Sequence, residues 1–563
     1  MSQAAEEMPR RRKKLHRGRQ VEFEPAAEIR NLLNGETPRR DLLIEYLHRI
    51  QDNFGCISAA HITALAAEMK LSTTEVYEVA TFYHHFDVIR ADADRPPALT
   101  VRVCESVTCE MFGSEALIKE LNQRCGDDVR VQRVPCVGRC AAAPVAVVGT
   151  NPIECATADS VEAAIDADAT APPTPTDLDY ARYRADGGYS LWQECLAGQH
   201  EREAIIECLE NSRLRGLGGA GFPAGRKWRI LAQQPAPRLI AVNADEGEPG
   251  TFKDRYYLER DPHRFIEGML IAAWAIEAKA CYIYLRDEYA ECRETLTREL
   301  MALATDPPGE LPLIELRRGA GAYICGEESA MIESIEGKRG MPRLRPPYVA
   351  EVGLFGRPTL EHNLETLHWV RDIVRNGADW FASQGRNDRP GLRSFSVSGR
   401  VNKPGVHLTP AGITMRELID EYCGGMLDGH EFYGYFPGGA SGGILPASLG
   451  DVPLDFDTLQ EYGCFIGSAA IIVLSQHDSA RDAALNAMRF FHHESCGQCT
   501  PCRVGTEKAS RIMAQADWDV PLLEDLATVM EDASICGLGQ AAPNPMRCAL
   551  KYFADEFKRG NKQ

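Results

Sequence analysis

ESCGQCTPCRVGT, residues 494–506, places three cysteines, Cys496, Cys499 and Cys502, at C-x2-C-x2-C spacing. A fourth cysteine, Cys536, follows further along the chain in ASICGLGQ. Three thiolates in one tight loop and a fourth on a distant segment suit an iron–sulfur cubane, because the loop holds three corners and the distant segment closes the last. A structural zinc site usually takes its ligands as two separated pairs and is the weaker alternative. The stretch therefore predicts a 4Fe–4S cluster within a C-terminal segment whose pattern is helical.

A second set of four cysteines lies nearer the N-terminus, as the pairs Cys104/Cys109 and Cys136/Cys140. The spacings are C-x4-C and C-x3-C, and each pair follows a predicted strand, ALTVRVC or VRVQRVPC. Two pairs of thiolates can hold a 2Fe–2S cluster, with two sulfurs on each iron. Zinc stays open as an alternative from the spacing alone. The order strand–helix–strand–strand predicts a compact α/β unit around these cysteines.

Length and charge restrict the class of protein. The chain has 563 residues, which suggests about four domains at about 150 residues each. Its net charge of −19 argues against a nucleic-acid-binding role. The basic run RRRKKLHRGR at 10–19 is interpreted as part of a solvated, disordered tail.

The expected location follows from apolar runs and cysteine usage. The longest apolar run is interrupted by Glu277 and Lys279, so no membrane span is expected. The N-terminus lacks the apolar core of a secretory signal. An odd total of 19 cysteines argues against a disulfide framework and favours metal ligation by the clustered ones. We therefore expect a cytoplasmic protein.

A glycine-rich loop, GLGGAG at 216–221, matches the pattern G-x-G-x-x-G. The dinucleotide-binding fingerprint requires a strand before the loop, whereas EREAIIECLENSRLR has the periodicity of a helix. That interpretation therefore fails on context. The loop can still bring backbone N–H groups close to an anion, with Lys227 following it, and an ordinary helix-ending turn is the alternative.

Polar groups follow two further predicted strands. The strand at 239–242 is followed by a set of amide and acidic side chains, and ligands of open α/β sheets bind at such strand ends. The members of this set are Asn243, Asp245, Glu246 and Glu248. Beyond a later strand, Gly326, Glu327 and Glu328 open a helix whose N–H groups are placed to receive a phosphate or a polar ring edge. A solvated loop is the alternative for the set that follows the strand at 239–242.

Four motifs in order resemble one known family. GLGGAGFPAGRKW, NADEGEPGTFKDR, GAYICGEES and ESCGQCTPCR…SICGLG resemble the NADH-binding flavoprotein subunit of respiratory NADH:quinone oxidoreductase and its soluble relatives. The N-terminal part, with FGCISAAHITALAAEMKLSTTEVYEVATFYHHFDV and CESVTC…CVGRC, resembles the thioredoxin-like 2Fe–2S subunit of the same complex. The two are fused here, and the resemblance covers about residues 28–555.

The resemblance implies sites for FMN and NAD(H). It implies no catalytic side chain beyond the bound FMN, with Glu248 and Glu328 near the flavin and nicotinamide. The implied flavin set is Gly216, Gly218, Gly219, Gly221, Lys227, Asn243, Asp245, Glu246, Glu248, Tyr323, Gly326, Glu327 and Glu328. The implied NAD(H) contacts are Phe222, Lys227, Glu248, Glu328, Arg345 and Tyr348. His362 replaces an asparagine common in the family, which puts its contact with the flavin phosphate in doubt, while Asn363 is retained.

Composition and resemblance together predict an α/β multidomain chain. The predicted units are a basic disordered tail (1–27), a helical bundle (28–95), a thioredoxin-like 2Fe–2S domain (96–165), a linker (166–200), an FMN/NAD(H)-binding domain (201–390), a ubiquitin-like β domain (391–478) and a helical 4Fe–4S domain (479–563).

The fused layout also resembles the diaphorase subunits of soluble NAD-dependent formate dehydrogenases and NAD-reducing hydrogenases. DPHRFIEGMLIAAWAIEAKACYIYLRDEY and YFPGGASGGILP look most like the β subunit of the molybdenum- or tungsten-containing formate dehydrogenase. This implies hydride transfer between NAD(H) and FMN, a relay through the 4Fe–4S cluster, and a formate-oxidising partner that carries molybdenum or tungsten and further iron–sulfur clusters. The acidic Glu248 and Glu328 favour NAD over NADP. A hydrogenase or NADH:quinone oxidoreductase module and a non-enzymatic zinc scaffold are the alternatives.

Overall fold

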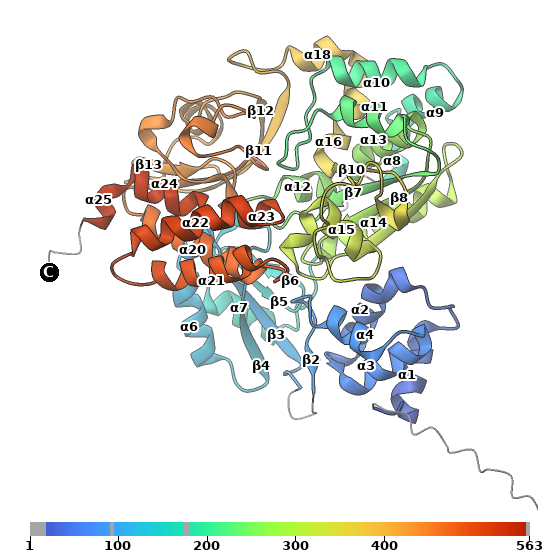
Figure 1. The fold of residues 1–563 in the computed structure, drawn as a ribbon, viewed down its shortest axis with the longest axis horizontal. Helices are drawn as coiled ribbons and strands as arrows, with labels where there is room; N and C mark the ends of the chain where they lie inside the picture. Colours follow the sequence, from blue (N-terminus) through green and yellow to red (C-terminus); the bar gives the residue numbers. More distant parts are fainter. Residues whose placement is uncertain (1–18, 91–94, 174, 176–178, 559–563) are drawn as a thin grey trace, which may run out of the picture.

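The computed structural model describes residues 19–90, 95–173, 175 and 179–558 (Figure 1). Much of the predicted basic tail, residues 1–18, lies outside the described residues. Helix α1 (Phe23–Leu33) begins before the predicted boundary at residue 28. The prediction was wrong there because Ala26, Ile29 and Leu33 form an apolar stripe that is buried, and this stripe was not recognised in the sequence.

The N-terminal bundle consists of short helices in one corner of the molecule (Figure 1). After α1 come α2 (Leu43–Phe54), α3 (Ala59–Met69) and α4 (Thr73–Ala80). A pair of two-residue parallel strands, β1 (Ile57–Ser58) and β2 (Val88–Ile89), closes the bundle. Ser58 and Ser72 accept hydrogen bonds from backbone N–H groups at the starts of α3 and α4.

The second unit is a four-stranded sheet in the order β4-β3-β5-β6. Strand β3 (Leu99–Cys104) runs parallel to β4 (Val129–Val134) and antiparallel to β5 (Ala146–Val148), which pairs with β6 (Asn151–Ile153). Helices α5 (Val107–Met111), α6 (Ser114–Arg124) and α7 (Ala158–Asp166) accompany it. Because β3 and β4 are parallel, the two cysteine loops that follow them emerge at the same edge of the sheet.

The predicted linker is wrong over its second half. Helices α8 (Tyr180–Ala185) and α9 (Ser190–Leu196) occupy this segment, and Tyr189 and Trp192 are buried in the main core. The Tyr183 hydroxyl donates to the buried carboxylate of Glu267 at 2.6 Å. The composition typical of a linker ends near residue 178, and the aromatic residues after it belong to the next domain.

The central domain is built on an all-parallel sheet in the order β10-β7-β8-β9. Its strands are β7 (Arg238–Ala244), β8 (Ala278–Leu285), β9 (Leu313–Arg318) and β10 (Thr359–Asn363). Its helices are α10 (Arg202–Asn211), α11 (Ala224–Ala232), α12 (Lys253–Arg260), α13 (Pro262–Ala275), α14 (Ala290–Thr305), α15 (Glu328–Ile335), α16 (Leu364–His368), α17 (Val370–Asn376) and α18 (Ala378–Ala382). The sequence patterns had not indicated β10, which lies at one edge of the sheet.

A five-stranded sheet follows, in the order β12-β11-β15-β13-β14. Its strands are β11 (Leu392–Gly399), β12 (Gly405–Pro410), β13 (Phe432–Phe436), β14 (Leu445–Pro446) and β15 (Ala470–Ser475), with the short helix α19 (Met415–Glu417) between β12 and β13. The C-terminal helices are α20 (Ala480–Glu494), α21 (Thr500–Met513), α22 (Val520–Ala533), α23 (Gly537–Ala541), α24 (Asn544–Tyr552) and α25 (Ala554–Phe557).

One apolar core runs through the last three units. Buried residues of the parallel sheet, the five-stranded sheet and the C-terminal helices belong to a single hydrophobic cluster. Figure 1 shows the C-terminal helices packed beside the five-stranded sheet and facing the β3–β6 sheet. Within the described residues, no helix is long and apolar enough to cross a lipid bilayer.

Candidate cofactor site

Two adjoining cavities open at the carboxyl edge of the parallel sheet. The glutamate cavity, about 680 Å³, is lined by Glu246 and Glu248 among others, and the lysine cavity, about 720 Å³, is lined by Lys227. The two cavities share a wall formed by Gly218, Gly219, Ala220, Asn243, Gly326, Glu327 and Asn363. Each volume is in the range that cofactor pockets occupy.

The parallel pairing of β7 and β10 places two asparagines side by side in this wall. Asn243 and Asn363 are register partners at the ends of their strands. The Asn243 amide donates to the carbonyl oxygen of Gly326 at 2.9 Å, and the Asn363 amide donates to the Asp254 carboxylate at 2.6 Å. Both side chains are therefore fixed by the protein while they face the cavities.

The glycine loop lines both cavities and needs its glycines. Gly219 and Gly221 have φ of +131° and +65°. A Cβ on Gly221 would lie 2.5 Å from the Phe456 ring, and one on Gly218 would lie 3.0 Å from the Cβ of Asn363. The loop follows α10, so the expectation that it is not the strand-led dinucleotide fingerprint is confirmed. The loop is a close-fitting cradle in which backbone, not side chains, faces the cavity.

Lys227 provides the positive charge of the lysine cavity. Its ammonium group donates to Glu361 at 2.8 Å and lies 3.8 Å from Glu328. Burial lowers the pKa of Lys227, but the two carboxylates outweigh it and raise the pKa above the usual value. Burial raises the pKa of Glu328, and Lys227 opposes that shift. Sequence reasoning missed Glu361, although it precedes His362 on a strand that ends at the site.

The outer rim of the lysine cavity carries exposed apolar faces. Phe222 and Tyr348 line it with 41% and 55% of their surface exposed. Arg345 lines the same cavity and forms ion pairs with Glu327 and, at 3.2 Å, with Glu328. Two aromatic faces beside a cation and carboxylates suit a planar ring with hydrogen-bonding edges.

Glu248 is held rigidly in the glutamate cavity. Its carboxylate accepts from the Ser441 backbone N–H at 2.7 Å and hydroxyl at 2.8 Å, and from the Tyr323 hydroxyl. Burial raises its pKa. Ser441 comes from the loop before β14, so the five-stranded sheet completes this cavity. The glycine-rich YFPGGASGGIL was the available signal for that contribution.

The carboxylates of Glu327 and Glu246 cap the starts of helices, where the sequence had led us to expect backbone N–H groups available to an anion. The Glu327 carboxylate accepts from the backbone N–H groups of Ser329 and Ala330, at 3.1 and 2.9 Å. The N-terminus of α15 is therefore capped by the protein itself, and the prediction that its N–H groups are free for a phosphate is wrong. Glu246 likewise accepts from two backbone N–H groups at the start of α12.

Asp245 leaves one acceptor unused. Its Oδ2 is buried and has no protein partner among the described residues, although the side chain lines the glutamate cavity. Burial raises its pKa well above the ordinary value. A buried polar atom without a partner is costly, so it indicates that a ligand group completes it.

His362 is tied to the protein. The Trp228 indole N–H donates to the His362 Nε2 at 2.8 Å, so the ring carries its proton on Nδ1. Burial keeps the pKa of His362 well below its usual value. His362 therefore lines the lysine cavity as a neutral imidazole whose Nδ1–H is a hydrogen-bond donor. Its retained neighbour Asn363 lines both cavities.

The four N-terminal cysteines come together as predicted. Cys104, Cys109, Cys136 and Cys140 are all buried, and the sulfurs of Cys136 and Cys140 are 3.3 Å apart. Hydrogen bonds to Cys109 and Cys136 raise the pKa of Cys104. Cys125 lies in a different apolar cluster, and Cys155 is exposed. Four converging thiols from two loops match the donor set of a 2Fe–2S cluster.

The four C-terminal cysteines also converge. Cys496, Cys499, Cys502 and Cys536 surround a small pocket, with Cys499 at the start of α21 and Cys536 at the start of α23. Burial raises the pKa of Cys536 to about 12. Ile324 and Leu538 line both this cysteine pocket and the glutamate cavity. The two sites are therefore separated by single side chains.

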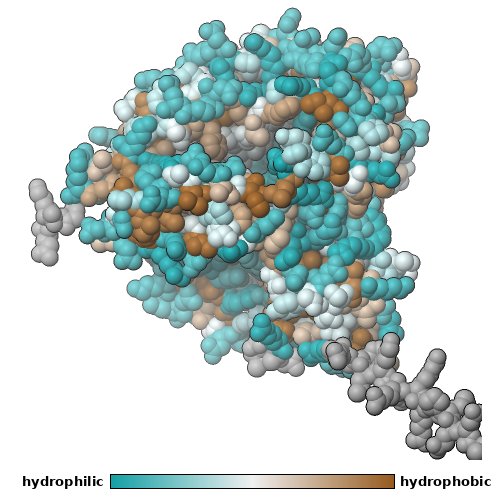
Figure 2. Space-filling view, in the orientation of Figure 1, coloured by the Kyte–Doolittle hydropathy of each residue, from teal (hydrophilic) through white to brown (hydrophobic). Residues whose placement is uncertain are grey.

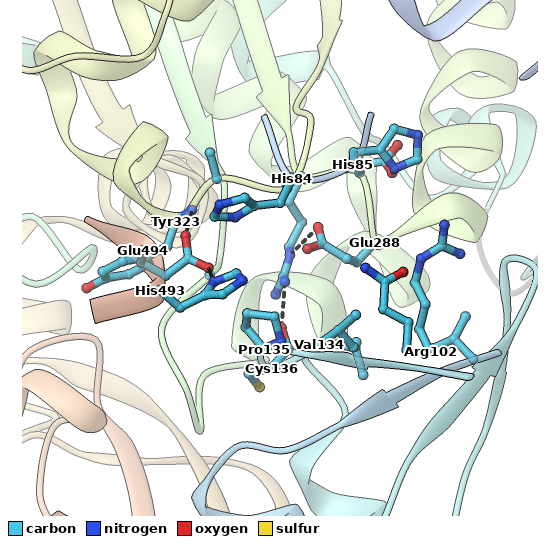
Figure 3. Close-up of a pocket in the computed structure, with 18 of the residues that line it drawn as sticks. His84, His85, Arg102, Val134, Pro135, Cys136, Glu288, Tyr323, His493 and Glu494 are labelled. Carbon is cyan, nitrogen blue, oxygen red and sulfur yellow. Dashed lines mark hydrogen bonds and ion pairs between the residues drawn. The ribbon is translucent and has the colours of Figure 1, made fainter. Parts of the chain in front are cut away.

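A further cavity lies beside Cys136 (Figure 3) and shares the lining residues Asp245, Gly247 and Tyr323 with the glutamate cavity. The Arg286 guanidinium donates to the carbonyl oxygen of Cys136 at 2.7 Å and to that of Glu246 at 2.5 Å. Figure 3 shows Glu494 between Tyr323 and His493, on the other side of this cavity from Glu288. One buried cation thus links the two loops.

Three family models match consecutive parts of the chain. Residues 29–168 match the thioredoxin-like [2Fe-2S] ferredoxin model, residues 209–372 the Nuo51 FMN-binding domain, and residues 482–560 the NADH-ubiquinone oxidoreductase-F iron-sulfur binding region. Together they account for both cysteine sets and for the cavity-bearing sheet.

Known proteins match long parts of the chain. An F subunit of the NADH-quinone oxidoreductase of Rhizobium meliloti is 40% identical over 67% of this chain and 92% of its own. Its counterpart in Aquifex aeolicus is 40% identical over 68% of this chain and 91% of its own. A crystal structure of an NAD+-reducing [NiFe]-hydrogenase in the H2-reduced state superposes with a TM-score of 0.82 at 32% identity, covering 93% of this chain and 94% of that chain.

Proposed function

Because the chain belongs to the family of the F subunit of NADH-quinone oxidoreductase, with FMN, a 2Fe–2S and a 4Fe–4S cluster as its cofactors, we propose that the two cavities form its FMN and NAD(H) site. Cys496, Cys499, Cys502 and Cys536 would hold the 4Fe–4S cluster, which would supply single-electron transfer between this site and a partner protein. The chain works in this proposal as the diaphorase module of a larger complex.

The lining of the cavities supports binding of FMN. The backbone of Gly216, Gly218, Gly219 and Gly221 faces the lysine cavity, with Lys227 as a counter-charge for a phosphate. The unpartnered Oδ2 of Asp245 accepts from a ligand hydroxyl, and Asn243 is held in place between the cavities. Bound FMN supplies the conversion between a two-electron hydride and single electrons. The side chains bind and orient it.

NAD(H) is placed by the rim of the lysine cavity. Phe222 and Tyr348 offer apolar faces for stacking, and Arg345 offers a cation. Glu328 and Glu361 line the same cavity, so a 2′-phosphate on the nucleotide brings further negative charge close to two carboxylates. We therefore expect selectivity for NAD(H) over NADP(H). Equal rates of flavin reduction by NADH and NADPH contradict this assignment.

The shared lining of the glutamate cavity and the cysteine pocket carries the proposal. Ile324 and Leu538 touch both spaces, so a flavin in the cavity and a cluster on the four cysteines are neighbours through buried side chains. A zinc scaffold with an unused pocket gives no reason for this contact. A colourless, zinc-containing protein without flavin absorbance contradicts the proposal.

The 2Fe–2S cluster lies on another side of the flavin site in this proposal. Its ligands are Cys104, Cys109, Cys136 and Cys140, whose loop is linked to the flavin loop through Arg286. The link gives the cluster a fixed position beside the glutamate cavity. A cluster held there would supply a store for electrons.

The partner docks beside the 4Fe–4S cluster. Figure 2 shows hydrophobic residues gathered over the C-terminal helices. In α22, Val520, Leu522 and Val529 are 38%, 43% and 53% exposed. Helix α22 packs against α21 and α23, which carry cluster cysteines. An apolar surface next to the cluster suits a partner that carries the next redox centre.

The sequence resemblance leads us to propose formate as the electron source, oxidised by a partner that carries molybdenum or tungsten and further iron–sulfur clusters. The full-length similarity to an NAD+-reducing [NiFe]-hydrogenase favours hydrogen as the second candidate. The sequence-based expectation of a cytoplasmic location stays a prediction.

Purification of the chain with its native partners, followed by assays of formate-dependent and hydrogen-dependent NAD+ reduction, decides between the electron sources. Formate-dependent reduction supports the first candidate. Failure with formate and success with hydrogen replaces it with the second.

A further inference from the structure

Two buried cysteines outside the cluster ligands lie in contact. The sulfurs of Cys464 and Cys548 are 3.4 Å apart, and the residues are 2% and 3% exposed. Cys464 follows a turn in the loop before β15, and Cys548 lies in α24. From sequence, Cys464 is interpreted as a small buried hydrophobe. Its contact with Cys548 spans 84 positions of sequence and is not visible in any local pattern.

The surroundings bring the two sulfurs together and keep other groups away. A Cβ on Gly443 would lie 2.6 Å from the Cys464 sulfur and 3.0 Å from the Cys548 sulfur. Gly443 has a φ of +83° and packs its bare backbone against both thiols. The pair is therefore closely covered on this side, and any larger residue at 443 would separate it.

The loop that carries Cys464 forms part of the glutamate cavity. Gly463, Cys464, Phe465, Gly467 and Ser468 all line this cavity. Cys464 is thus the member of the pair that belongs to the cavity wall, whereas Cys548 lies in α24 and does not line the cavity. The pair combines one thiol of the cavity wall with a second thiol in contact with it, and two cysteines in contact can be joined by a disulfide through a sulfenic acid.

The electrostatic setting favours reaction of the pair. The Cys464 thiol donates toward Cys548, which lowers the pKa of Cys548 despite its burial, and the Lys551 ammonium lowers it further. The same hydrogen bond raises the pKa of Cys464. The proton between the two sulfurs therefore stays mainly on Cys464, and the Cys548 sulfur carries the thiolate character.

We propose that Cys464 and Cys548 form a reversible disulfide when hydrogen peroxide enters the glutamate cavity. The Cys464 proton passes along the hydrogen bond to the Cys548 sulfur, and the Cys464 thiolate formed in this way attacks one peroxide oxygen. The O–O bond breaks, an S–OH group forms, and the displaced hydroxide takes up a proton from solvent and leaves as water. The Cys548 sulfur then attacks the Cys464 sulfur, the S–OH bond breaks, and the hydroxyl leaves with the Cys548 proton as a second water. Two thiols lose two electrons, and one peroxide becomes two waters.

Formation of the bond requires a small local shift. The sulfurs must approach from 3.4 Å to about 2.05 Å, a closure of about 1.4 Å. Gly463 and Gly467, both with positive φ, flank Cys464 closely and allow the loop to move. The loop already contacts α24 through the Tyr552 hydroxyl, which donates to the Tyr462 carbonyl at 2.9 Å. The disulfide thus staples the cavity wall to a helix of the C-terminal bundle.

The proposal does not depend on the identity of the ligand in the cavity. The full-length protein, purified without oxygen, is treated with a few equivalents of hydrogen peroxide, alkylated and digested without reductant. Mass spectrometry is expected to find the peptide of Cys464 joined to that of Cys548, and dithiothreitol is expected to remove this species. Absorbance of the protein before and after treatment records any loss of clusters.

Variants test the order of events. Cys548→Ser is expected to leave Cys464 as a sulfenic acid that dimedone traps, whereas Cys464→Ser is expected to give little adduct at Cys548. Cys423→Ser removes a buried thiol elsewhere and is expected to leave the cross-link unchanged. Absence of the joined peptide in the wild type, or adducts of equal yield in both single variants, overturns the proposal. Absence of flavin and iron from the protein before peroxide treatment, with the cross-link still formed, contradicts only the proposed function.

Discussion

Lys227 offers the sharpest test of the proposed anion site, because two carboxylates depend on it. In the Lys227→Met variant, Glu361 and Glu328 lose the ammonium group that lies 2.8 and 3.8 Å from them. Both side chains are at least three-quarters buried, so solvent screens their mutual repulsion only in part. A phosphate in the lysine cavity then faces added negative charge.

The expected magnitude follows from the kind of contact removed. A hydrogen bond to a charged group contributes about 1.5–3 kcal/mol, which corresponds to a loss of affinity of about 10- to 150-fold. The dissociation constant for FMN, measured by quenching of flavin fluorescence on binding to deflavinated protein, is expected to rise by that factor in Lys227→Met. Lys403→Met replaces an exposed lysine on another domain and is expected to change nothing.

A second substitution tests whether the unpaired carboxylate of Glu361 causes the loss of FMN affinity. Glu361→Gln in the Lys227→Met background removes the charge that has lost its ion-pair partner, so part of the lost affinity is expected to return. Glu361→Gln alone frees the ammonium group for the ligand, and its affinity is expected to stay the same or increase. An FMN affinity of Lys227→Met within twofold of the wild type, or a double variant weaker than Lys227→Met, refutes the assignment of Lys227 as the counter-charge.

Three further predictions address the surroundings of the site. Arg286→Gln removes a buried cation beside Cys136, so the midpoint potential of the 2Fe–2S cluster in an EPR redox titration is expected to become more negative, whereas Arg286→Lys is expected to keep most of the wild-type potential. An unchanged potential in Arg286→Gln contradicts the role of Arg286 beside this cluster. Lys253→Met leaves two buried carboxylates, one of them that of Glu365 at 3.0 Å, without their cation, so the free energy of unfolding measured with denaturant is expected to fall by about 3–5 kcal/mol. A fall of less than about 1 kcal/mol shows that the ion pairs of Lys253 are dispensable. Burial raises the pKa of Glu246 from 4.5 to about 7, so the folded state binds more protons than the unfolded state between these pH values, and the free energy of unfolding is expected to fall as pH rises through this window. Glu246→Gln is expected to flatten this pH dependence, and an equal slope in the variant and the wild type refutes the prediction.

The cysteine sites were predictable because their ligands are close in sequence or follow adjacent strands. Cys496, Cys499 and Cys502 lie in one loop, so spacing alone places them together. Cys104 and the loop of Cys136 follow the parallel strands β3 and β4, and their meeting at one sheet edge follows from that topology. The role of the glycine loop as a cradle was also visible from the helix before it.

Other features depend on contacts that no local pattern encodes. Ser441 reaches Glu248 from another sheet, and Cys548 reaches Cys464 from a C-terminal helix. The acidic start of α15 was misinterpreted because the sequence does not show that the Glu327 carboxylate folds back onto its own helix. The helices after residue 179 were missed because the linker-like composition before them extended the predicted boundary too far.

Cofactor analysis of the Cys536→Ala variant tests the central claim most directly. Both proteins are purified without oxygen, and their iron, their FMN and the EPR spectra of their reduced clusters are compared. We predict that the wild type contains FMN, one 4Fe–4S and one 2Fe–2S cluster, and that the variant loses or alters only the 4Fe–4S signal while it keeps FMN and the 2Fe–2S signal. A wild type without iron and flavin, or a variant with an unchanged 4Fe–4S signal, contradicts the account.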